Sequence, residues 1–242
     1  MSLFGQVPST AEYKAFRKVN NTHVGEYGFL YEVCTLSSGS RPRWRAVQGP
    51  PNTFGMPGET SVAIDGIVHF LMAEVFFLVR QRKPVIQEDW IFSFDLETEK
   101  WRPNIKGPQG FFLDNASGLN GYYRQIQLSL TKLNGSLVIV HGPSPNMDIW
   151  FLMSFEKGFW VKQYSIQIER VYSYFWPVVV LQDGRIVIVI HVEGKQIVEI
   201  HNPRRNTFSV LADTSRSCAI NVYTGNLLSL GRQQPTINEV RN

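Results

Sequence analysis

Hydrophobic and polar residues alternate along most of this chain in short runs, and the runs come in pairs separated by turn residues. Residues 61–71 form an apolar run, an Asp-Gly turn and a second apolar run. Residues 130–140 repeat this order around Asn-Gly, and residues 178–189 repeat it around Asp-Gly. These dipeptides between alternating runs are the strongest short-range signal of a tight β-hairpin. The pattern therefore predicts three tight hairpins of one kind.

Each tight hairpin is followed by a second hairpin, which has charged residues at its tip and an aromatic residue just beyond. These second hairpins are expected over residues 91–101, 148–160 and 196–208. Two hairpins make a four-stranded antiparallel sheet, and such sheets in series make a β-propeller. One sheet cannot bury both of its faces alone, so stacking neighbouring sheets is the physical reason for the repetition.

The aromatic residues beyond the second hairpins mark equivalent positions of the repeat. They are Trp44, Trp101, Trp160 and Phe208. Their spacing is looser than the roughly 40–50 residues of a typical blade, and we expect the excess length in loops. Recurrence at equivalent positions predicts that these rings pack between blades.

The number of repeats predicts about four blades. Three full units cover residues 61–208, a half unit of two or more strands comes before them, and one strand over residues 222–230 follows. The expected fold is an all-β, kelch-like propeller of antiparallel four-stranded blades, either small or an incomplete part of a larger ring. It is expected to form a single domain over residues 1–242, with an ordered core of about residues 8–231. A short helix near residues 119–133 is less favoured than a strand, because residues 128–133 alternate with period two.

Composition and charge narrow the classes of partner. The chain is 43% hydrophobic and 18% charged, as in globular proteins. The net charge of +4 is mild and scattered, whereas a nucleic-acid surface would need clustered basic residues, so no nucleic-acid partner is expected. No apolar run approaches the ~20 residues of a membrane helix, and the first residues lack the features of a signal peptide. We therefore expect no membrane contact and a cytoplasmic or nuclear location, with Cys34 and Cys218 as reduced, buried thiols.

The sequence contains none of the usual catalytic motifs. A nucleophile elbow, a phosphate-binding loop and a zinc-binding His-Glu-x-x-His are all missing. His69 and His191 lie in expected strands, and Glu97 and Glu99 lie at an expected hairpin tip, where both should be solvated. We therefore expect no cofactor, no metal and no enzyme activity. The alternative is a propeller hydrolase or oxidase, because propellers can gather catalytic groups from different blades.

Two small groups of residues are candidates for contact with a protein partner. Tyr174 and Trp176 belong to an aromatic cluster before Pro177, and exposed aromatic residues are typical of binding hot spots. Arg204 and Arg205 form the densest basic pair and lie at an expected turn. Packing for the aromatic residues and solvation for the arginines are the simpler interpretations.

Several motifs, in order, resemble the plant F-box-associated domain. They are Pro-Ser-Thr-Ala-Glu-Tyr-Lys over residues 8–14, the strand and loop of residues 31–40, residues 91–101, the runs 148–150 and 156–162, and the closing run 223–230. Each motif alone is weak, and their order is what makes the resemblance specific.

The resemblance implies a propeller that presents loops to a target protein within an SCF-type ubiquitin ligase. In that family an F-box docks the ligase adaptor, and this sequence contains no such leucine-rich segment of ~45 residues. Contact with the adaptor is therefore expected only if an F-box is supplied elsewhere. The expected function is recognition of a protein partner of unknown identity, and a truncated product with little folded stability is a further possibility.

Overall fold

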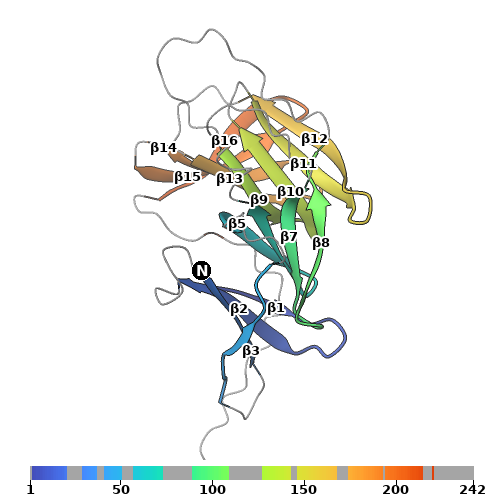
Figure 1. Ribbon diagram of the computed structural model, residues 1–242. Helices are drawn as coiled ribbons and strands as arrows, with labels where there is room; N and C mark the ends of the chain where they lie inside the picture. Colours follow the sequence, from blue (N-terminus) through green and yellow to red (C-terminus); the bar gives the residue numbers. More distant parts are fainter. Residues whose placement is uncertain are drawn as a thin grey trace, which may run out of the picture.

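The computed structural model describes residues 2–20, 29–36, 41–50, 57–72, 89–108, 127–142, 146–167, 174–192, 194–214 and 220. All regular elements in these ranges are β-strands. They form four separate antiparallel sheets of four strands, each in sequence order. The sheets are the blades of a four-bladed β-propeller, which confirms the expected fold class (Figure 1).

The strand bounds follow the repeat. Blade 1 contains β1 (Ser2–Gln6), β2 (Tyr13–Asn20), β3 (Phe29–Leu36) and β4 (Arg45–Val47). Blade 2 contains β5 (Pro57–Ile64), β6 (Ile67–Met72), β7 (Asp89–Asp95) and β8 (Lys100–Lys106). Blade 3 contains β9 (Gln127–Leu133), β10 (Ser136–Gly142), β11 (Asn146–Ser154) and β12 (Phe159–Gln167). Blade 4 contains β13 (Tyr174–Val180), β14 (Ile186–Val192), β15 (Lys195–Asn202) and β16 (Thr207–Thr214).

The first blade is complete, and the expected half unit was wrong. Strand β1 precedes Pro8 and pairs with β2 from Ser2 opposite Arg17 to Gln6 opposite Tyr13. Its five residues include a glycine, and none of them is fully buried. A strand this short, with no buried residue, leaves little hydrophobic pattern in the sequence. The strand expected over residues 222–230 lies outside the described residues.

The blades stack through their first strands. Strand β1 contacts β5, β5 contacts β9, and β9 contacts β13, so consecutive blades are neighbours in space (Figure 1). Between blades 1 and 2, the ring centroids of Phe16 and Phe94 are 4.7 Å apart, and those of Phe16 and Phe70 are 5.3 Å apart. All three rings are fully buried. Burial of these large rings is the main attraction between the two sheets.

A second buried cluster joins blades 3 and 4. It includes Val138 and Ile149 from blade 3 and Phe175, Ile186 and Ile188 from blade 4. The first cluster spans blades 1 and 2 and continues into blade 3 through Leu128 and other residues. Blade 3 therefore contributes to both cores and connects the two halves of the molecule.

The tight turns between the first and second strands confirm the predicted hairpins. Asp65 and Gly66 have φ of 47° and 77°, as the type I′ turn of a two-residue loop requires. Asn134 and Gly135 repeat this geometry with φ of 49° and 83°. Residues 182–184 differ from the expected two-residue turn, because they form a three-residue loop in which only the glycine has positive φ.

Candidate functional site

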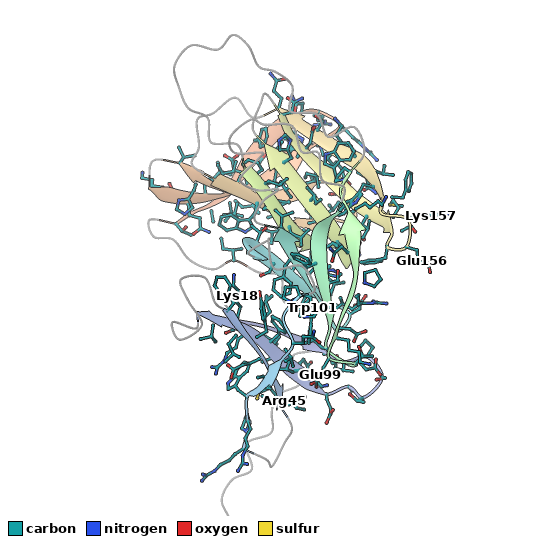
Figure 2. The ribbon with its side chains drawn as sticks, in the orientation of Figure 1. Lys18, Arg45, Glu99, Trp101, Glu156 and Lys157 are labelled. Carbon is teal, nitrogen blue, oxygen red and sulfur yellow. The ribbon has the colours of Figure 1, made fainter. Side chains whose placement is uncertain are left out.

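The hairpin between the third and fourth strands of a blade is called here the outer hairpin. In blades 2 and 3 it contacts the blade before it. In blade 2 its tip covers residues 96–99, and Glu99 reaches two cations of blade 1. Lys14 Nζ lies 2.8 Å from Glu99 Oε1. Arg45, which Figure 2 labels beside Glu99, also forms an ion pair with this carboxylate. The side chain of Lys14 is 11% exposed and that of Glu99 is 22% exposed. These ion pairs are therefore partly shielded and fasten blade 2 to blade 1.

The structure corrects the expectation that Glu99 is solvated, whereas Glu97 is exposed as expected. Glu97 accepts a hydrogen bond from Ser9 of blade 1, and Glu99 is half-buried between its two cations. Partial burial raises the pKa of Glu99, but the hydrogen bonds from Lys14 and Arg45 outweigh it, and the pKa is lowered overall. The hairpin tip looked solvated in sequence because nothing there reveals that it touches another blade.

The outer hairpin of blade 3 makes a comparable contact with blade 2. The ring of Phe155 stacks on that of His69 with centroids 5.7 Å apart. Gly158 sits so close to β8 that a Cβ on it would lie 2.8 Å from the Cβ of Lys106. The indole N–H of Trp160 donates to the carbonyl oxygen of Lys106 at 2.7 Å.

The indole hydrogen bond is a repeated device of the fold. Trp101 in blade 2 donates to the carbonyl oxygen of Gln48, just after the last strand of blade 1, also at 2.7 Å. Trp101 and Trp160 are both the second residue of a fourth strand, which confirms their predicted equivalence. Trp44 differs, because it precedes the fourth strand of blade 1. In blade 4 the equivalent residue is Phe208, which has no N–H to donate to blade 3.

Blade 4 also differs from blades 2 and 3 at the residue on the third strand that pairs with Phe208. The register pairs Phe94 with Trp101 in blade 2 and Leu152 with Trp160 in blade 3. In blade 4 it pairs His201 with Phe208. A core position held by an apolar residue in two blades is therefore histidine here. His201 is 2% exposed, and its Nδ1 has no hydrogen-bond partner among the described residues.

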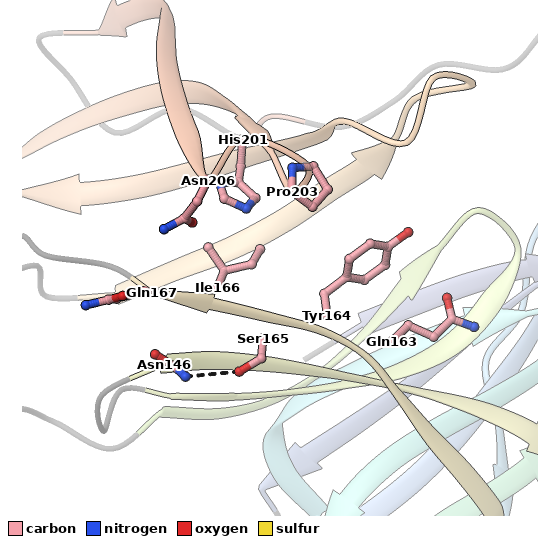
Figure 3. Close-up of a pocket in the computed structure, with 9 residues that line it drawn as sticks. All are labelled: Asn146, Gln163, Tyr164, Ser165, Ile166, Gln167, His201, Pro203 and Asn206. Carbon is pink, nitrogen blue, oxygen red and sulfur yellow. Dashed lines mark hydrogen bonds between the residues drawn. The ribbon is translucent and has the colours of Figure 1, made fainter.

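These changes coincide with a groove of about 380 Å³ between blades 3 and 4. Strand β12 forms one side, and the outer hairpin of blade 4 forms the other (Figure 3). Figure 3 shows Ile166 and Tyr164 on β12 facing His201 and the turn beyond it. The lining residues are mostly polar and uncharged: Asn146, Gln163, Tyr164, Ser165, Ile166, Gln167, His201, Pro203 and Asn206.

A hydrogen-bonded network holds the polar floor of the groove in place. Asn146 Nδ2 donates to Ser165 Oγ at 3.1 Å, and Ser165 Oγ donates to Asp148 Oδ1 at 2.6 Å. Lys162 Nζ lies 3.1 Å from the other oxygen of Asp148. The Asp148 carboxylate is therefore already occupied by partners from β12. Burial lowers the pKa of His201, so its ring is neutral near pH 7 and presents a polar atom without adding charge.

Two of the four predicted contact residues lie in a turn beside this groove, although neither is among the residues that line it. Arg204 and Arg205 are exposed in the outer turn of blade 4, between the lining residues Pro203 and Asn206. Among the described residues, neither guanidinium has an ion pair with a carboxylate. The turn beside the groove therefore carries two exposed positive charges.

The structure does not bring the other two predicted residues to the groove. Trp176 is half-buried in β13, where it pairs with Val189 in the middle of blade 4. Tyr174 begins the same strand opposite His191, at the end of the blade away from the arginine turn, and its side chain lies outside the described residues. The aromatic pair and the arginine pair are thus separate.

Sequence reasoning missed His201 and the whole of β12 as parts of a site. A signal for His201 was present, because aligning the three outer hairpins places it where Phe94 and Leu152 stand. Phe208 was grouped with the tryptophans as an aromatic landmark, although phenylalanine lacks the indole N–H that two of them use for a hydrogen bond. The lining of β12 gave no signal, since alternating Gln and Ser residues are ordinary on an exposed strand.

The described residues hold no other obvious chemical centre. No group of three or more His, Cys, Asp or Glu side chains within the described ranges could hold a metal ion. Cys34 is a buried free thiol, as expected, and Cys218 lies outside the described part. A search of the described residues finds no helix with the length and apolarity to cross a membrane.

Comparison with known proteins adds one distant likeness. No protein-family model matches the chain, and no curated protein matches it. Among solved structures the chain is similar to TolB from Acinetobacter baumannii, with a TM-score of 0.40 and 12% sequence identity. The match covers 86% of this chain and 42% of the TolB chain, so this chain spans less than half the length of that protein. At this identity and TM-score we take nothing about function from TolB.

Proposed function

We propose that this chain is a non-catalytic protein-binding module and that the groove between blades 3 and 4 holds its partner. The observation that carries the proposal is the groove itself, which is lined mostly by polar, uncharged side chains and lies beside the exposed turn that holds Arg204 and Arg205. A four-bladed propeller is compatible with a protein-interaction module, because its turns display side chains on a rigid frame. Binding energy would come from a few contacts in the groove, as at other protein interfaces.

The chemistry of the lining favours binding over catalysis. The nine lining residues include a histidine but no carboxylate, lysine or cysteine. General acid–base or nucleophilic catalysis needs a nucleophile or base oriented by a second group. His201 has no such group on its Nδ1, and the nearby Asp148 is engaged by Ser165 and Lys162.

The finer proposal follows from the resemblance to the F-box-associated domain. The module would act in the cytoplasm or nucleus as the part that recognises the target of an SCF-type ubiquitin ligase. An F-box supplied elsewhere would contact the adaptor. Purified adaptor should therefore show no binding to this chain alone in a pull-down, and direct binding would contradict this division of labour.

A matched pair of variants tests the binding function. Gln167→Trp places an indole in the groove. Gln182→Trp places one outside the groove, in the exposed turn between β13 and β14. Tagged wild-type chain and both variants would be used for affinity capture from plant cytosolic and nuclear extracts. Each captured protein would then be purified, and its affinity would be measured by calorimetry.

We expect at least one purified protein that binds the wild type and Gln182→Trp equally and binds Gln167→Trp more weakly by about tenfold or more. Equal affinity for all three chains would show that the partner does not bind in the groove. Failure of every captured protein to bind directly would contradict the binding function itself.

A further inference from the structure

The groove borders the edge of β12, and Asn146 at the start of β11 also lines it. Successive side chains of a strand point to opposite faces, so a cavity on one face is lined by alternate residues. Here all five consecutive residues 163–167 line the groove. This is the arrangement expected when the backbone edge of the strand borders the cavity.

Among the described residues, no strand pairs with the outer edge of β12. Strand β12 is outermost in its sheet, which has the order β12-β11-β10-β9. Such an edge carries unpaired N–H and C=O groups that can pair with an added chain. The outermost strands of the first two blades are less able to pair with an added strand, because β4 has only three residues and β8 contains Pro103, which has no N–H. Strand β12 has nine residues and no proline.

The turn beside the groove carries positive charge that no described carboxylate neutralises. The corresponding tip in blade 2 is acidic, and its Glu99 is consumed by ion pairs with blade 1. The tip in blade 4 is reversed in sign, and no described carboxylate of blade 3 pairs with Arg204 or Arg205. Exposed guanidinium groups favour carboxylates, which they can bind through two parallel hydrogen bonds.

The buried His201 supplies an independent sign of a missing ligand. Its side chain is 2% exposed, lines the groove, and keeps Nδ1 without a partner in the described structure. A buried polar atom without a hydrogen bond is costly and is usually explained by a group that binds there. A backbone amide of a bound peptide would provide such a partner.

From these observations we propose that the groove binds an extended acidic peptide. The peptide adds to β12 as a fifth strand of blade 3, and an Asp or Glu side chain of it contacts Arg204 and Arg205. Strand addition is a known mode of peptide recognition in which the main chain gives affinity and side chains give specificity. The inference rests on the proposed binding function and adds the class of partner. Strand pairing also selects a polypeptide over a nucleic acid, which has no matching backbone.

A randomised peptide library displayed on phage tests the charge preference without a known partner. The probes are wild-type chain, Arg204→Glu/Arg205→Glu, and Lys132→Glu/Lys195→Glu as control. Both double variants change the net charge equally, and Lys132 and Lys195 are exposed residues that do not line the groove. A thermal midpoint measured for each protein verifies that it is folded.

We expect the wild type and the control to enrich peptides rich in Asp and Glu. The groove variant should lose that preference, and a synthetic peptide from the wild-type selection should bind it more weakly by about tenfold or more. Enriched peptides without an acidic excess would overturn the inference while leaving a binding groove. Acidic peptides that bind both double variants alike, or no enriched peptides, would also overturn it.

The strand-addition part is tested by methylating the backbone of the selected peptide one nitrogen at a time. In a peptide paired along one edge, alternate N–H groups point at β12 and the others point away. N-methylation should therefore weaken binding with a period of two residues. Equal effects at neighbouring positions would contradict strand addition and would leave the separate capture experiment on protein binding unaffected.

Discussion

Glu99, Gly158 and Asn206 occupy the same place in three consecutive blades, directly before the fourth strand. Their φ values are 55°, 55° and 49°. Gly and Asn adopt this left-handed conformation readily, whereas it costs a glutamate about 1–2 kcal/mol. The ion pairs of Glu99 with Lys14 and Arg45 offset this cost. The type of residue at this position thus follows from the contacts that the outer hairpin makes: ion pairs require the Glu99 side chain in blade 2, and close packing on Lys106 requires Gly158 in blade 3.

His69 makes the stability of the fold depend on pH. Burial, with a smaller contribution from the charge of Arg102, lowers its pKa from 6.5 to about 4. Between pH 6.5 and 4 the imidazole is mostly protonated in the unfolded chain and mostly neutral in the folded chain. Stability is therefore full above pH 6.5 and falls as the pH drops from 6.5 to 4, by at most about 3 kcal/mol from this residue.

Urea unfolding of wild type and His69→Gln between pH 4 and 8 measures this effect. We expect the free energy of unfolding to fall less steeply with decreasing pH in the variant. His141 and His201 also have lowered pKa values because of burial, so some slope should remain. Identical slopes in the two proteins would contradict the assignment to His69.

His201 is expected to weaken the fold in exchange for a polar atom in the groove. His201→Leu restores the apolar residue that Leu152 provides in blade 3 and removes the unpaired Nδ1. We expect the variant to be more stable by about 1 kcal/mol, within the usual cost of a buried unsatisfied group. Chemical denaturation at pH 7.5 measures the change, and a loss of stability would mean that the imidazole has a partner in the folded chain.

At the scale of strands and hairpins, indole hydrogen bonds join blade 2 to blade 1 and blade 3 to blade 2. Trp160→Phe leaves the Lys106 carbonyl without its donor, and we expect a loss of about 1–2 kcal/mol. Trp150→Phe is the matched control, because Trp150 Nε1 is buried without a hydrogen-bond partner among the described residues.

Urea denaturation at neutral pH compares the two variants. Removing the Trp150 N–H takes away no hydrogen bond, so this variant should lose less stability than Trp160→Phe. Equal losses would indicate that ring size, and not the bond to Lys106, determines the effect.

The strand pattern was predictable from sequence because turns and alternation are local properties. The Asp65-Gly66 and Asn134-Gly135 turns require positive φ, and the chain encodes this requirement directly. The contacts between blades were not predictable. Nothing near Glu99 in the sequence reveals that Lys14 and Arg45 lie beside it, because that proximity depends on how two sheets stack.

The candidate site was predictable only in part for the same reason. Arg204 and Arg205 could be placed at a turn, and the turn is where the structure has them. Their relation to β12 needs the packing of blade 4 on blade 3, which involves residues about 40 positions apart in sequence. Trp176 shows the converse, since a conspicuous aromatic residue proved to be a half-buried part of a strand.

At the scale of the molecule, two buried clusters share blade 3, so the four blades should unfold together. The first cluster includes Phe16 of blade 1 and Leu128 of blade 3, and the second joins Val138 of blade 3 to Phe175 of blade 4. Calorimetry should show one cooperative transition, with equal calorimetric and van't Hoff enthalpies. Two separated transitions would mean that the halves are independent, and no transition would indicate a chain with little folded stability.

The most direct measurement of the central claim is amide NMR of the labelled chain during titration with a peptide from the library selection. The account predicts that shifts concentrate in residues 163–167 of β12 and residues 202–206 of the outer turn of blade 4. It also predicts that the β12 amides facing the groove become slower to exchange with solvent. Shifts confined to the turns of blades 1 and 2, with β12 unchanged, would contradict the account.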